Sequence, residues 1–209
     1  MQIAIIGSGN IGGGLARAWR RAGHGVTFGA RDPNEAELAT LCTEIGAKAK
    51  SIADSVTGAE VVVLAMPFGA LDSVLAATGD LAGIIVIDAT NAVTRGTSGM
   101  TLEYGHTTSS GEQVQARIPR ARVVRSFNAQ GAENLANPTY GDVVASNFYC
   151  GDDAEAKHAV ALLITDVGFE PIDAGPLASA RLLEPLMLLW ITCSRTVGTR
   201  DLGFKLLRR

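Results

Sequence analysis

The chain has 209 residues, of which 47% are hydrophobic and 19% charged, with a formal net charge of −3 at pH 7. This balance is typical of a globular protein with enough apolar material for one large core. No basic stripe stands out of the slightly acidic chain, so the composition argues against nucleic acid or an anionic membrane as a partner.

The cysteines and the apolar segments indicate in which cellular compartment the protein is expected. The three cysteines are odd in number and show no spacing pattern, which is typical of reduced thiols in a cytoplasmic protein. The chain opens on "MQIAIIG" without a positively charged segment, so we expect no secretory signal. The apolar run 185–191 is far shorter than the ~20 residues that span a bilayer. We therefore expect a cytoplasmic protein, and the three histidines show no spacing that indicates a metal site.

Short apolar runs alternate with helical patterns along the whole chain. The expected strands cover residues 2–7, 25–31, 59–66, 83–91, 122–129, 142–153 and 169–175. The expected helices cover residues 11–22, 34–46, 70–78, 109–117, 130–137, 154–168 and 177–199. Residues 94–117 are polar, and only their second half is predicted to be helical.

Strands joined by crossover helices predict a Rossmann-like, doubly wound α/β fold with a mainly parallel sheet. No linker or composition break appears, so residues 1–209 are predicted to form one domain. Its last part, about 177–209, reads as a small helical extension. Pro185 lies inside this apolar helix and is expected to kink or restart it. A helix that is apolar nearly all round is buried either in the core or at a homodimer contact.

A glycine motif follows the first strand and opens the first helix. The G-x-G-x-x-G spacing is made by Gly7, Ser8, Gly9, Asn10, Ile11 and Gly12. In this setting the first glycine permits the tight turn, the second lets the backbone approach a pyrophosphate, and the third lets helix and strand pack closely. The helix N-terminus then faces the phosphates. The motif therefore predicts a dinucleotide site rather than a plain glycine turn.

The end of the second strand distinguishes NADP from NAD. An NAD site has a carboxylate about 20 residues beyond the motif that accepts from the ribose 2′-hydroxyl. Here that position is Ala30, followed by Arg31, whose guanidinium is suited to a 2′-phosphate. Asp32 is adjacent and offers the competing interpretation, a contact to the ribose. The sequence favours NADP.

Loops after three other strands are expected to reach the same crevice, because ligands lie outside the carboxyl ends of parallel strands. These segments are Met66-Pro67-Phe68, Asp88-Ala89-Thr90-Asn91 and Ser126-Phe127-Asn128-Ala129. The segment Met66-Pro67-Phe68 offers apolar side chains that can contact a ribose or the edge of a nicotinamide ring. The alternative for all three is that they only cap helices, and Asp88 and Asn128 are open to a structural role.

The sequence shows no acid–base pair of the kind that alcohol and hydroxy-acid dehydrogenases use. No Y-x-x-x-K occurs, and the chain is too short for a large all-helical substrate domain. Hydride transfer to a flavin-like ring needs stacked rings and exclusion of water instead. The sequence therefore favours an acceptor that is itself a cofactor. Two alternatives stay open: a sensor that binds NADP(H) without turnover, and carbonyl or imine reduction with Tyr104 or His106 as donor.

The sequence resembles the NADPH-dependent reductases of the deazaflavin coenzyme F420 along essentially its whole length. The segments that carry this resemblance are "IIGSGNIGGGLA", "GARDP", "DATN", "SFNAQGAENL", "YCGDD", "DAGPLASARLLEPLMLLWI" and "LGFKLLRR". The resemblance implies a Rossmann-like domain, commonly dimeric, that transfers hydride between the nicotinamide C4 and the deazaflavin C5. The sequence is also similar to the cytosolic part of membrane ferric and cupric reductases, in which NADPH reduces a flavin.

The resemblance also assigns site residues. It implies that Ser8, Gly9, Asn10 and Ile11 hold the pyrophosphate and that Ala30 and Arg31 face the 2′-phosphate. The nicotinamide half would be lined by Met66, Pro67, Phe68, Asn91 and Ala129. Apart from the resemblance, the last expected strand ends at Gly175, so Gly175, Pro176, Leu177 and Arg181 are expected at the edge of the acceptor pocket. Two positions depart from the family pattern: Ala30 replaces a common serine, and Glu35 replaces a common basic residue. No catalytic side chain and no metal ligand is assigned.

Overall fold

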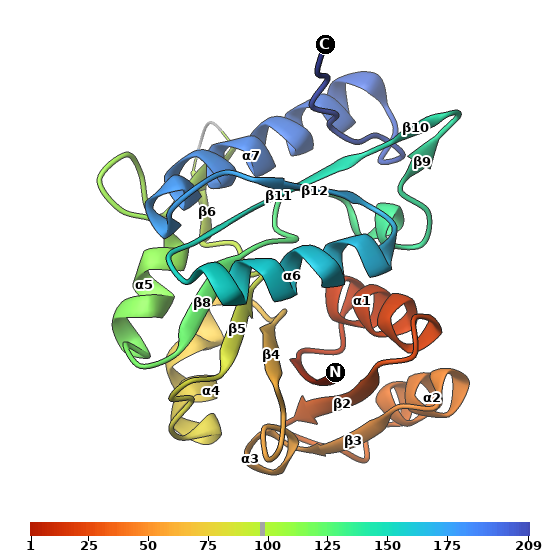
Figure 1. Ribbon diagram of the computed structural model, residues 1–209, viewed down its shortest axis with the longest axis vertical. Helices are drawn as coiled ribbons and strands as arrows, with labels where there is room; N and C mark the ends of the chain where they lie inside the picture. The colour runs from red at the N-terminus through yellow and green to blue at the C-terminus, as the bar shows by residue number, and fades with distance from the viewer. Residues whose placement is uncertain (97–98) are drawn as a thin grey trace.

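The computed structural model describes residues 1–96 and 99–209 and is built around one eight-stranded sheet (Figure 1). The strand order is β12-β11-β8-β5-β4-β1-β2-β3. The strands are β1 (Gln2–Ile6), β2 (Gly25–Ala30), β3 (Lys48–Ser51), β4 (Val61–Leu64), β5 (Ile85–Asp88), β8 (Arg122–Arg125), β11 (Ser146–Gly151) and β12 (Glu170–Asp173). This arrangement confirms the Rossmann-like fold with a mainly parallel sheet.

Helices cover both faces of the sheet. They are α1 (Asn10–Arg21), α2 (Ala36–Ile45), α3 (Ile52–Ser55), α4 (Leu71–Thr78), α5 (Ser110–Arg117), α6 (Ala154–Val167) and α7 (Ala180–Val197), with 3-10 turns η1 (Phe68–Ala70), η2 (Ala132–Leu135) and η3 (Leu177–Ser179). The central strands are buried on both sides because successive side chains point to opposite faces. In β1, Ile3 and Ile5 pack into the core under α1, α2 and α6, whereas Ala4 and Ile6 pack under α3, α4 and α5.

The sheet changes direction after β8. The strand β11 pairs antiparallel with β8, and β12 then pairs parallel with β11. The connection from β8 to β11 contains η2 and the short hairpin β9 (Thr139–Tyr140) and β10 (Val143–Val144) instead of a crossover helix. Without a crossover helix, a parallel return is not available, so the chain enters the sheet in the opposite sense.

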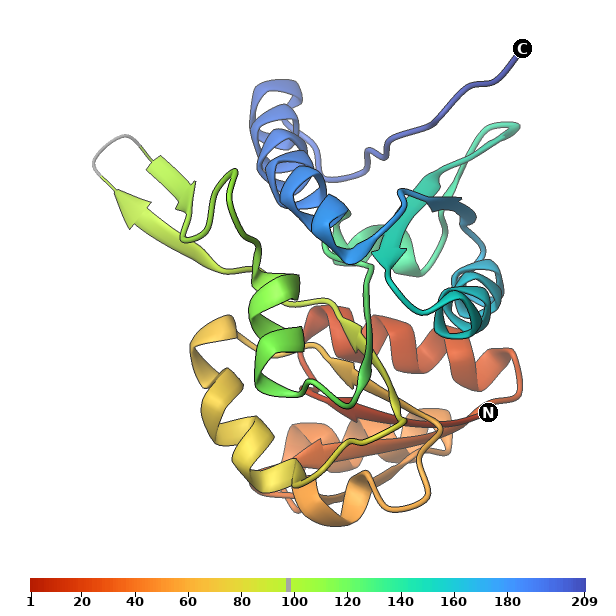
Figure 2. The same cartoon turned by 60° about the vertical axis from the view of Figure 1, so that its left-hand side comes forward.

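Two local predictions from sequence were incomplete. The edge strand β3 and the turn α3 were missed, because the sequence "KAKS" of β3 is largely polar and lacks an apolar run. Within the polar stretch 94–117, the strands β6 (Val93–Gly96) and β7 (Gly99–Leu102) pair antiparallel, although their polar composition predicted no strand. Figure 2 shows this pair of strands projecting away from the main sheet, on the side of α5 and α7.

The C-terminal helix α7 runs from Ala180 to Val197 with Pro185 inside it. The helix is continuous through Pro185, so the prediction of a restart was wrong, whereas a kink at Pro185 stays a prediction. Pro185 has no N–H that could donate to the carbonyl oxygen of Arg181. Pro185 lies on the exposed side of the helix, where water can donate to that carbonyl instead. Near the N-terminus the loss of one backbone bond is tolerated more easily than in mid-helix.

One face of α7 is buried through Leu183, Met187 and Trp190, while the side chains of Leu182 and Leu189 are 71% and 50% exposed. The homodimer contact therefore stays a prediction. By length and composition alone, the helical segment Leu177–Val197 is apolar enough to cross a membrane. Its most apolar 18-residue stretch has a mean hydropathy of 1.2, and 39% of that stretch is buried inside the protein. The sequence argument considered only the apolar run 185–191. The helical segment that contains this run is longer, with 21 residues.

Candidate dinucleotide-binding site

The glycine turn between β1 and α1 is held by close backbone contacts. Gly7 has a φ of +111°, and a Cβ there would lie 2.5 Å from the carbonyl oxygen of Ala65, just after β4. A Cβ on Gly12 would lie 1.9 Å from the carbonyl oxygen of Gly7. Both glycines are therefore required by the packing of the protein itself. They bring the N-terminus of α1 to the crevice between β1 and β4, where the strand order reverses.

Gly9 differs from these two glycines. Its backbone, with φ −67° and ψ −169°, is open to any residue, and a Cβ there would meet no atom of the described chain within 4 Å. Gly9 is thus not required by the fold, and it leaves an open cradle above the turn. No side chain caps α1, and its first turn has no acidic residue. Free N–H groups, a helix N-terminus and an open cradle fit a pyrophosphate.

The strand β2 ends at Ala30, which is half-buried, and Arg31 follows it on the surface. None of the ion pairs found among residues 1–96 and 99–209 involves Arg31. The carboxylate of Asp32 accepts a hydrogen bond from the backbone N–H of Asn34 at 2.9 Å. Asp32 therefore closes its own turn through Oδ1, and the side chains of Arg31 and Asp32 are both exposed at the end of β2.

The loop after β4 carries Met66, Pro67 and Phe68. Met66 is half-buried and Pro67 exposed, whereas the ring of Phe68 is 9% exposed and packs edge-on against Tyr104, with ring centroids 5.7 Å apart. Desolvation raises the pKa of Tyr104, so its hydroxyl stays protonated at neutral pH. Of the two donors considered from sequence, Tyr104 lies next to the predicted nicotinamide half, and His106 is exposed.

Asn91 and Ala129 come together at the carboxyl ends of β5 and β8. The side-chain amide of Asn91 donates to the carbonyl oxygen of Asn128 at 3.2 Å and accepts from Arg125 at 3.3 Å. Asn128 in turn donates to the carbonyl oxygen of Leu183 at 3.1 Å. Asp88 accepts two hydrogen bonds from Thr90. Asp88 and Asn128 thus make hydrogen bonds within the fold, and Asn91 is held in place at both ends of its amide.

Sequence reasoning missed two charged residues of this region, Arg125 and Glu184, and did not foresee the backbone conformation of Phe127. Phe127 has a φ of +60°, which is unusual for a residue with a side chain, and its ring packs edge-on against Trp19 at 5.8 Å. Arg125 and Glu184 are buried beside Asp88. Charged residues at the end of the buried strand "RVVR" and within the apolar helix "LLEPLMLLWI" were the signals available in the sequence.

Two cavities of similar size are found among the described residues. One of about 360 Å³ is lined by Met100, Arg195, Arg200 and residues of the end of α7. Another of about 360 Å³ lies between α1 and η2 and includes Asn10 and Arg17. The second cavity borders the glycine turn through Asn10.

Comparison with known proteins agrees with this geometry. Residues 2–92 match the family model described as NADP oxidoreductase, coenzyme F420-dependent. A solved structure from Arthrobacter sp. FB24, assigned as an F420-dependent NADP reductase, superposes with a TM-score of 0.91 and 34% identity, covering 100% of both chains. The chain belongs to the coenzyme F420-dependent NADP oxidoreductase family. The family is one of NADP-linked oxidoreductases, which is what the glycine motif and Arg31 predicted.

Two further proteins of known name are similar to this chain. The F420-dependent NADP reductase of Methanothermobacter thermautotrophicus is 28% identical over 99% of this chain and 94% of its own length. The metalloreductase STEAP3 of Rattus norvegicus is 32% identical over 90% of this chain. The chain spans only 37% of the length of that metalloreductase.

Proposed function

We propose that this protein transfers hydride between NADPH and a deazaflavin, coenzyme F420, with a flavin as the alternative acceptor. The observation that carries the proposal is the open cradle at Gly9, at the uncapped N-terminus of α1, in a chain of this family. The pyrophosphate would lie on residues 8–11, the 2′-phosphate beside Ala30 and Arg31, and the nicotinamide near Met66, Pro67, Phe68, Asn91 and Ala129.

The residues proposed for the nicotinamide half support an acceptor that is itself a cofactor. None of these five carries an ionisable side chain. When bound, the cofactor supplies a hydride from its nicotinamide ring, and transfer to a second ring requires no proton from the protein. The task of the chain is then to hold the ring, orient one of its faces and exclude water. The buried ring of Phe68 and the fixed amide of Asn91 suit that task.

Turnover with purified protein tests the acceptor. NADPH should be oxidised rapidly when F420 is added, and more slowly or not at all with FMN, FAD or ferric chelates. Loss of the nicotinamide absorbance measures the rate. Faster turnover with a flavin and ferric iron would favour the reaction suggested by the metalloreductase relative. Tight NADPH binding without turnover with any of these acceptors would contradict hydride transfer and favour the sensor.

The choice between NADP and NAD is expected to depend on Arg31. In Arg31→Ala the Michaelis constant for NADPH should rise about tenfold or more, because charge-assisted hydrogen bonds to a phosphate contribute about 1.5–3 kcal/mol. The constant for NADH should change little, since NADH lacks the 2′-phosphate. Steady-state kinetics with both cofactors measures the ratio. Equal changes for the two would show that Arg31 does not recognise the phosphate.

A further inference from the structure

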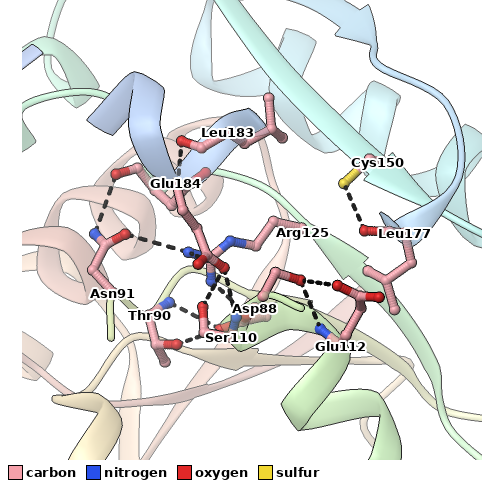
Figure 3. Close-up of polar contacts among 12 residues, drawn as sticks. Asp88, Thr90, Asn91, Ser110, Glu112, Arg125, Cys150, Leu177, Leu183 and Glu184 are labelled. Atoms are coloured by element: carbon pink, nitrogen blue, oxygen red, sulfur yellow. Dashed lines mark hydrogen bonds and ion pairs between the residues drawn. The ribbon is translucent and has the colours of Figure 1, made fainter. Parts of the chain in front are cut away.

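A cluster of three charged side chains is buried beside Asn91 (Figure 3). Asp88 ends β5, Arg125 ends β8, and Glu184 comes from the N-terminal part of α7. Their side chains are 0%, 0% and 2% exposed. The guanidinium of Arg125 donates to Asp88 through Nη1, and its Nη2 lies 3.6 Å from Oε1 of Glu184. The cluster thus joins the sheet to the C-terminal helix.

The groups that contact the two acids are hydrogen-bond donors. Oδ1 of Asp88 accepts from the backbone N–H of Thr90 at 3.0 Å and from the Thr90 hydroxyl at 2.7 Å. Oε1 of Glu184 accepts from the N–H of Ser110 at 2.7 Å and from the Ser110 hydroxyl at 2.6 Å. Backbone N–H groups and a guanidinium only donate, which is what carboxylates require. With both acids in the carboxylate form, two carboxylates and one guanidinium give the cluster a net charge of −1.

This excess negative charge lies one side chain away from the proposed nicotinamide half. Arg125 also donates to Oδ1 of Asn91 at 3.3 Å. Asp88 pairs with Leu64 across the sheet, and Met66 follows Leu64 by two residues. The N-terminus of α5, which Glu184 contacts at Ser110, offsets part of the charge through the helix dipole. The remainder acts through the protein interior, where charges are screened less than in water.

We propose that this cluster makes the site bind NADP⁺ in preference to NADPH, so that bound NADPH is a stronger hydride donor. The inference rests on the proposed function. The nicotinamide ring carries a formal positive charge in NADP⁺ and none in NADPH, so nearby negative charge stabilises only the oxidised form. As an order of magnitude, a unit charge that acts across about 10 Å at an effective dielectric constant of about 20 changes the ratio of the two affinities by roughly tenfold.

The substitution Glu184→Gln tests the proposal, because it removes the excess charge and keeps the shape of the side chain. Dissociation constants of NADP⁺ and NADPH are measured by calorimetry on the full chain. The ratio Kd(NADP⁺)/Kd(NADPH) should rise roughly tenfold in the variant. An unchanged ratio, including one in which both constants rise by the same factor, would overturn the proposal and leave Glu184 a purely structural role.

Two variants serve as matched controls. Ser110→Ala removes a hydrogen bond to Glu184 but no charge, so it should lower the melting temperature without changing the ratio. Asp80→Asn removes one negative charge at the opposite end of the same strands, where Asp80 and Arg120 form an ion pair with 56% and 71% exposed side chains. Solvent screens that charge, so the ratio should also stay constant. A changed ratio in either control would contradict the assignment to the buried cluster.

The wild-type protein gives the same test without a substitution, should Glu184→Gln fail to fold. It is expected to bind NADP⁺ more tightly than NADPH, and the reverse order would overturn the proposal. Binding of neither cofactor to the wild type would contradict the proposed function itself. If both cofactors bind but Glu184→Gln leaves the ratio Kd(NADP⁺)/Kd(NADPH) unchanged, only the proposal about the cluster is contradicted.

Discussion

Replacing Gly9 with alanine should weaken NADPH binding about 100-fold while the protein folds as before. The added methyl group would enter space in which no atom of the described chain lies within 4 Å, so the fold is not disturbed. A pyrophosphate in that space would have to move away from the N–H groups of α1. Loss of two charge-assisted hydrogen bonds, at about 1.5 kcal/mol each, corresponds to roughly two orders of magnitude in Kd.

Calorimetric titration with NADPH and thermal unfolding without cofactor measure the two halves of this prediction. The melting temperature of Gly9→Ala should equal or slightly exceed that of the wild type, since alanine restricts the unfolded chain. Gly13→Ala is the matched control in the same helix, because its Cβ would touch Leu41 and Arg17 at 3.5 Å, inside the protein. Normal NADPH binding by Gly9→Ala would mean that the cradle holds no phosphate.

The largest loss of stability is expected for Gly12→Ala. A Cβ at this position would lie 1.9 Å from the carbonyl oxygen of Gly7 and 3.2 Å from a methyl group of Ile5. Both obstacles are parts of the fold, so α1 must move away from β1. Overpacking of this kind costs about 3 kcal/mol, which lowers the melting temperature of a chain of this size by about 10 °C.

Differential scanning calorimetry of Gly12→Ala and Gly13→Ala separates this packing effect from helix propensity. Both substitutions replace glycine with alanine in the first turns of α1, and alanine alone favours a helix by about 0.5–1 kcal/mol. Gly13→Ala should therefore be neutral or slightly stabilising. Equal melting temperatures for the two variants would show that the contact between Gly12 and Gly7 does not restrict the packing of α1.

Local sequence patterns predicted those features of the fold and the site whose residues are neighbours along the chain. The apolar strands and the glycine motif predicted the Rossmann-like sheet, because hydrophobic periodicity and turn chemistry act over a few residues. The edge strand β3 and the pairing of β6 with β7 were missed because their sequences are polar. The direction of β11 depended on the connection from β8, which no local pattern reports.

The sequence by itself determined the fold class, the family and the glycine turn followed by Arg31, because each depends on patterns of neighbouring residues that are read directly along the chain. Only the tertiary structure showed that Gly9 opens on free space while Gly7 and Gly12 are fixed by packing. It alone assembled Asp88, Arg125 and Glu184, which are far apart in the chain, into one buried cluster. Charge interactions of this kind depend on distance and burial in space, and neither is encoded by spacing along the chain.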